Sequence, residues 1–150
     1  MEFAENAVLD SIANNAFNDA NIKSLMIPDK VKYIGERAFN DCDSLKNLTL
    51  SSELQGIENS AFRRCISLES VVIPDKVKYL GYDSFIDCYA LTTVEFSSLS
   101  QLDSIAQGVF AHTNIESIML PAGVKHIGLY AFYNCQNLDQ LHIHENVAFV

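Results

Sequence analysis

Apolar residues recur along the whole chain at a fixed spacing. One phenylalanine marks each period of 22 to 25 residues, giving Phe17, Phe39, Phe62, Phe85, Phe110 and Phe132. An isoleucine or leucine stands five residues before each of them, and a leucine or valine stands three residues earlier still. Each period therefore supplies the same apolar positions, which one unit cannot bury alone but stacked units can. The pattern predicts a repeat solenoid.

The segment that follows each phenylalanine alternates apolar and polar residues. Leu45, Leu48 and Leu50 show the pattern, and later periods repeat it. Alternation with a period of two predicts a short strand with one face in the core. Stacked units would place these strands side by side in a parallel sheet, about 4.8 Å apart.

The return segment of each unit has the pattern V-x-x-I-G-x-x-A-F. Glycines follow the isoleucine or leucine at Gly35, Gly81 and Gly128, where we expect a turn with positive φ. The following A-F-x-x-C segment is too short for a long helix, so we expect one turn of α- or 3₁₀-helix there.

Composition and charge narrow the class of protein. The 150 residues are 49% hydrophobic and 10% aromatic, which suffices for a continuous core. The net charge of −9 argues against binding to nucleic acid or to an anionic membrane surface. No apolar run approaches the roughly 18 residues of a membrane-spanning helix. The first basic residue is Lys23, so we expect no signal peptide on this chain.

The segment I-P-D-K-V-K-Y-I-G-E-R-A-F-N-D-C-D-S-L-K-N-L-T-L, residues 27–50, closely resembles the BspA-like leucine-rich repeat. The resemblance extends over essentially the whole chain. It implies an α/β fold: a curved leucine-rich-repeat solenoid of about six units, with a parallel β-sheet on one face and loops with short helical or 3₁₀ turns on the other. Residues 1–150 would form a single domain.

The family resemblance also implies a function. Members are often surface or secreted microbial proteins that contact host cells or matrix, for example by adhesion to fibronectin or fibrinogen. We therefore expect a recognition or adhesion module for protein or glycoprotein partners, outside the cell or on its surface, with no cofactor and no enzymatic activity. Two alternatives stay open: a structural spacer in a larger surface protein, and an intracellular scaffold in a protist.

The outward positions of the predicted strands are the candidate binding surface. Stacked strands would expose them as one continuous concave face in which apolar spots recur on alternate repeats. The candidate residues are Ser24, Met26, Asn47, Thr49, Ser70, Val72, Thr93, Glu95, Ser117, Met119, Gln140 and His142. A second candidate contact surface is aromatic, on return loops, and comprises Tyr33, Tyr79, Tyr82, Tyr130 and Tyr133.

Four cysteines follow the repeat phenylalanine by three residues: Cys42, Cys65, Cys88 and Cys135. They occupy one structural column, so two disulfides are conceivable. We favour a ladder of buried free thiols that act as small apolar groups. No zinc-binding spacing is present.

Other chemistry is weakly supported. His142 and His144 lie on one face of a strand, but no third metal ligand is evident nearby. No G-x-S-x-G segment and no glycine-rich phosphate loop occurs in the sequence.

The two ends of the chain lack polar caps. Met1–Phe3 matches a strand segment, and the chain ends before a further phenylalanine unit. We interpret the sequence as a fragment of a longer array, and predict self-association through its ends, including the strand edge at 141–143.

Overall fold

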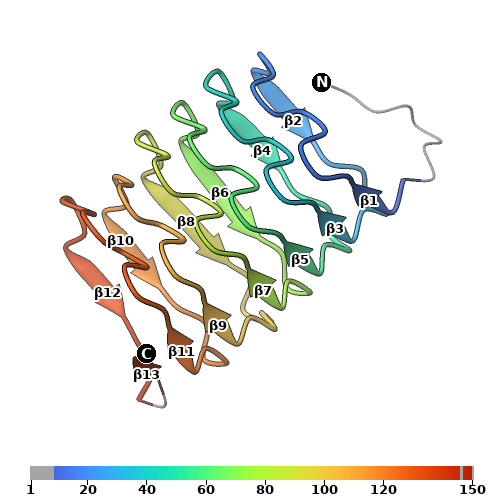
Figure 1. The fold of residues 1–150 in the computed structure, drawn as a ribbon. Coiled ribbons are helices and arrows are strands. Elements are labelled where there is room, and N and C mark those ends of the chain that lie inside the picture. Colours follow the sequence, from blue (N-terminus) through green and yellow to red (C-terminus); the bar gives the residue numbers. More distant parts are fainter. Residues whose placement is uncertain (1–8, 146, 150) are drawn as a thin grey trace.

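The computed structural model describes residues 9–145 and 147–149. The chain winds into a stack of similar coils, and the first and last coils lie at opposite ends of the stack (Figure 1). Each complete coil contains a longer strand, a two-residue strand, and a turn segment that carries the repeat phenylalanine, which we call the Phe turn. All strand pairs are parallel.

The longer strands run along one side of the solenoid, which we call the long-strand face. They are β2 (Ser24–Met26), β4 (Asn47–Thr49), β6 (Ser70–Ile73), β8 (Thr93–Phe96), β10 (Ser117–Met119) and β12 (Gln140–His142). Four of them pair in the order β12-β10-β8-β6, and β2 pairs with β4. Each step along the sheet moves one repeat along the sequence, as predicted.

A second parallel sheet, which the sequence analysis did not predict, follows the return segments (Figure 1). Its strands are β1 (Ser11–Ile12), β3 (Tyr33–Ile34), β5 (Gly56–Ile57), β7 (Tyr79–Leu80), β9 (Ser104–Ile105), β11 (His126–Ile127) and β13 (Ala148–Phe149). They pair in chain order, from β1 to β13. Two extended residues per strand are too few for periodicity to reveal, although the same two positions recur in every coil.

The expected α/β class and its helical turns are wrong: the described residues form parallel strands and turns, and no helix. Alternate N–H groups of the Phe turn donate to the next coil, as in Arg37 to the carbonyl of Asn59 (3.0 Å) and Phe39 to that of Ala61 (2.8 Å). The intervening N–H groups close local turns. The residues two before and two after each phenylalanine have positive φ, for example 52° at Arg37 and 57° at Asp41. A right-handed helix cannot continue through either position.

The expected role of the return-segment glycines is also wrong. Gly35, Gly81 and Gly128 do not have positive φ; among the described glycines only Gly108 does, at 67°. Their function is close approach. A Cβ atom at Gly81 would lie 2.6 Å from the backbone nitrogen of Asn59 in the preceding coil. The absent side chain lets the backbones of successive coils touch.

A stack of phenylalanine rings forms the centre of the core. Neighbouring ring centroids are 5.2 to 5.9 Å apart, and the ring planes differ by 6° to 20°. The four middle rings, Phe39, Phe62, Phe85 and Phe110, are fully buried. Inward leucine, isoleucine and valine side chains of both sheets surround the stack. Stacked units thus bury what a single unit would expose.

In the described residues β12 pairs with β10, and Leu141 is 38% exposed. Self-association through the strand edge at 141–143 stays a prediction. The predicted strand segment Met1–Phe3 lies outside the described residues. No helix long and apolar enough to cross a bilayer occurs in the part of the chain that the structure describes.

Candidate functional site

The long-strand face carries all twelve candidate residues predicted from the sequence. In β2, β6 and β10 exposed and inward positions alternate, so that the residues flanking Leu25, Val71 and Ile118 point to solvent. The register aligns them in two columns: Ser24 lies beside Asn47, and Met119 beside His142. All twelve are exposed. The structure therefore brings them together on one surface, while their role in binding stays a prediction.

Three large apolar side chains interrupt this polar face. Met26 is 62% exposed, Val72 is 56% exposed and Met119 is 65% exposed. They occupy one column on alternate coils, hence about 10 Å apart at the spacing of parallel strands. Water contact makes these positions unfavourable in the isolated chain, and contact with a partner would remove that cost.

A pocket of about 630 Å³ opens at the C-terminal ends of β8 and β10. Glu95 and Met119 of the long-strand face line it, together with Ser97, Ser98 and Ser100 of the following loop. The sequence alone did not predict this pocket. The signal was the spacing of 25 residues between Phe85 and Phe110, the longest in the chain.

Hydrogen bonds within the lengthened loop fix its shape. Ser97 Oγ accepts a hydrogen bond from the N–H of Leu99 (3.2 Å), and the N–H of Ser100 donates to the carbonyl of Ser97 (3.0 Å). The N–H of Gln101 donates to the carbonyl of Asp75 in the previous coil (2.8 Å). The loop therefore forms a defined wall beside the exposed side chains of β8 and β10.

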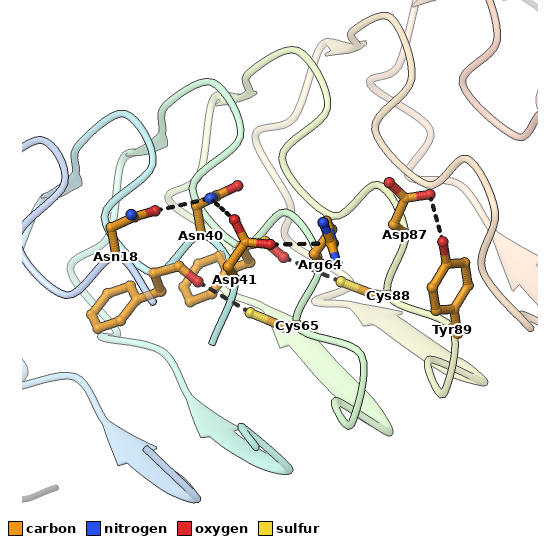
Figure 2. Close-up of polar contacts among 10 residues, drawn as sticks. Asn18, Asn40, Asp41, Arg64, Cys65, Asp87, Cys88 and Tyr89 are labelled. Atoms are coloured by element: carbon orange, nitrogen blue, oxygen red, sulfur yellow. Dashed lines mark hydrogen bonds and ion pairs between the residues drawn. The ribbon is translucent and has the colours of Figure 1, made fainter. Parts of the chain in front are cut away.

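The four cysteines form the expected ladder of free thiols. Three are buried and Cys135 is partly exposed. Each sulfur donates to the carbonyl of the phenylalanine in an earlier coil, at 3.0 to 3.3 Å. Figure 2 shows two of these bonds, from Cys65 and Cys88, beside the polar contacts of the Phe turns. The thiols thus stabilise the stacking of coils.

Burial makes Cys42, Cys65 and Cys88 poor nucleophiles. It raises the pKa of Cys88 to about 12 and the pKa of Cys65 well above its ordinary value of 9.0. We expect iodoacetamide at pH 8 to alkylate Cys135 first, because it is partly exposed, and the three buried cysteines only on unfolding. Mass spectrometry of the alkylated peptides measures this order. Rapid labelling of all four in the folded chain would contradict the buried ladder.

The same shift predicts a dependence of stability on pH. The folded chain keeps the Cys88 proton up to a pKa of about 12, whereas the unfolded chain releases it near 9.0. Since the folded state then binds more protons, the free energy of unfolding falls as pH rises between these values.

The two histidines that the sequence predicted on one strand do not lie in the same strand. His142 lies in β12, and His144 lines the 630 Å³ pocket. No group of three histidine, cysteine or carboxylate side chains arranged for a metal ion occurs among the described residues.

Among the five candidate tyrosines, Tyr33 and Tyr79 lie in β3 and β7 rather than in loops. The other three tyrosines lie on the Phe turns, and a contact role for the five stays a prediction.

The model for the BspA type leucine rich repeat region matches residues 10–139 in six copies, and the chain belongs to this family. A Treponema pallidum leucine-rich-repeat protein is similar at 26% identity with a TM-score of 0.74, over 99% of this chain and 69% of that one. No match was found among curated proteins.

Two further solved structures are longer than this chain. The pneumococcal vaccine antigen PcpA is 28% identical with a TM-score of 0.81, over 91% of this chain and 36% of that one. A leucine-rich cell surface protein of Faecalibacterium prausnitzii is 26% identical with a TM-score of 0.66, over 94% of this chain and 44% of that one. The chain thus spans less than half of either protein.

Proposed function

We propose that this chain is a non-catalytic recognition module of a bacterial surface or secreted protein, and that it binds a protein or glycoprotein through the long-strand face. The observation that carries the proposal is the column of exposed Met26, Val72 and Met119 on an otherwise polar, regular surface. Apolar anchors surrounded by polar groups are typical of protein interfaces. The cell surface protein and the vaccine antigen among the similar structures support a location outside the cell.

The 630 Å³ pocket adds a recess to this surface. Met119 lines the recess, and so do Ser97, Ser98 and Ser100 of the lengthened loop. A partner side chain seated there would contact an apolar group and hydrogen-bond donors together. Such central recesses commonly hold the anchors of protein interfaces. We therefore place the strongest contacts near β8 and β10.

Replacement of both methionines by glutamate tests the proposal. The wild-type chain should bind saturably to at least one member of a panel of immobilised matrix and serum glycoproteins, and Met26→Glu/Met119→Glu should lose that binding. Both side chains point to solvent, so the circular dichroism and unfolding midpoint should not change. Leu129→Glu is the matched control, because Leu129 is equally exposed on a Phe turn. Undiminished binding by the double variant would overturn the proposal.

Deletion of two coils distinguishes a recognition module from a structural spacer. Deletion of residues 27–72 joins Met26 to Ile73, after which Pro-Asp-Lys-Val-Lys-Tyr follows as it does after Ile27. The deletion removes two coils without a foreign junction. A recognition surface spread over the coils should lose affinity, whereas a spacer has no affinity to lose in the panel.

A further inference from the structure

One pocket lies away from the long-strand face, on the Phe turns of the coils that contain Phe85, Phe110 and Phe132. Its volume is about 650 Å³. Asp83 and Ile86 line it from one coil, Gly108 and Ala111 from the next, and Tyr130 and Tyr133 from the third. No lysine or arginine is among its lining residues.

The pocket lies over the middle coil, where Gly108 has no side chain and Ala111 has only a methyl group. The position two before the repeat phenylalanine holds Asp83, Gly108 and Tyr130 in these coils, and all three have positive φ, between 56° and 67°. Positive φ alone therefore does not require glycine here. The absence of a side chain matters instead, because a Cβ atom at Gly108 would overlap Oδ1 of Asp83. The carboxylate thus reaches over the glycine into the gap.

The coils that border the pocket follow one another at the spacing of stacked rings. The rings of Phe85 and Phe110 are 5.9 Å apart, and those of Phe110 and Phe132 are 5.7 Å apart. The flanking coils are therefore two stacking steps apart, and planar groups stack at 4.5–7 Å between centroids. The Asp83 carboxylate already occupies the space directly over Gly108, so a guest guanidinium would lie beside that carboxylate.

Two aromatic rings and a carboxylate determine the chemistry of the guest. Tyr130 is 63% exposed and Tyr133 is 57% exposed, and their rings meet edge to face at 5.6 Å. His112 packs against Tyr133 in the same way at 5.4 Å. The π-face of a tyrosine attracts cations, and a carboxylate accepts two hydrogen bonds from one guanidinium. The net charge of −9 favours a cationic guest as well.

We propose that this pocket binds an arginine side chain of a protein partner, with the guanidinium stacked on Tyr130 or Tyr133 and hydrogen-bonded to Asp83. Arginine fits better than lysine because its guanidinium is planar and forked. A planar group can stack on a tyrosine ring, and a forked group can donate two hydrogen bonds to one carboxylate. The site is separate from the long-strand face, and binding here does not depend on that face.

Titration of the full chain with Nα-acetyl-arginine N-methylamide tests the proposal. Amide resonances of Gly108 and Ala111 should shift saturably in ¹H–¹⁵N NMR spectra. The citrulline analogue, which has the same shape without the charge, should bind about tenfold more weakly. The lysine analogue should also bind more weakly than the arginine compound. Equal shifts with the citrulline analogue, or no saturable shift with the arginine compound, would overturn the proposal.

Two variants locate the site without disturbing the backbone. Asp83→Asn and Tyr130→Asn place asparagine at positions with positive φ, which asparagine tolerates well. Both should abolish the arginine-induced shifts. Asp87→Asn is the matched control, because Asp87 lies in the same coil, also has positive φ, and does not line the pocket. Loss of the shifts in Asp87→Asn, or their persistence in Asp83→Asn, would contradict the assignment.

Discussion

Phe62→Ala should cost about 3–5 kcal/mol of the free energy of unfolding. The ring is fully buried and lies 5.3 Å from Phe39 on one side and 5.3 Å from Phe85 on the other. The backbone around it cannot close the cavity, since the N–H of Phe62 is bonded to the carbonyl of Ser84 in the next coil (2.9 Å). Urea unfolding followed by circular dichroism measures the loss.

Phe132→Ala is the matched comparison for that experiment. Phe132 is only partly buried and stacks on Phe110 alone among the described rings. The decrease in the free energy of unfolding in Phe132→Ala should therefore be less than half of that in Phe62→Ala. Phe62→Ala interrupts the stack in the middle of the array. The two halves should therefore unfold separately in this variant, because neighbouring units of a solenoid stabilise each other. Equal losses at both positions would contradict a continuous stack.

Gly81→Ala should destabilise the chain by about 1–3 kcal/mol, although alanine restricts the unfolded chain more than glycine does. A Cβ atom there would lie 2.6 Å from the backbone nitrogen of Asn59 and 2.7 Å from the carbonyl carbon of Glu58. The gain from the unfolded state is about 0.4–1 kcal/mol where the native site accepts the methyl group. Backbone atoms cannot rotate away as a side chain can. The energetic cost of the clash therefore exceeds the gain from the unfolded state.

Gly123→Ala provides the control in the same chain. The nearest atom to its Cβ would be the carbonyl oxygen of Leu102 at 3.2 Å, and Gly123 is exposed. The carbonyl oxygen would have to move by only a few tenths of an ångström, so the urea midpoint should change much less than in Gly81→Ala. A loss at Gly123 as large as that at Gly81 would show that backbone freedom, rather than contact between coils, sets the requirement for glycine.

The solenoid follows from the sequence because its determinants repeat. The columns of leucine and phenylalanine predicted the long strands and the core, and the structure places Leu25, Leu45 and Phe39 in that core. The second sheet and the chain of turns were not predicted. Both depend on hydrogen bonds between coils, which join residues 21 to 26 apart in the sequence. A local pattern such as A-F-x-x-C carries no information about that pairing.

The candidate surface was easier to predict than its recesses. Alternation along each strand identified Met26 and Met119 as exposed, since a strand that buries one residue exposes the next. The two pockets depend instead on departures from the repeat: a longer loop at Ser97–Ser100 and small residues at Gly108 and Ala111. A consensus built from the repeats removes these departures, so only a comparison between neighbouring coils reveals them.

Methyl NMR of methionine is the most direct test that the long-strand face binds a partner. The chain contains three methionines, and two of them, Met26 and Met119, lie on that face. With ¹³C-methyl-labelled methionine and a partner from the glycoprotein panel, the account predicts that both methyl signals shift or broaden in proportion to the bound fraction. Unchanged signals from both methionines in a saturated complex would contradict it.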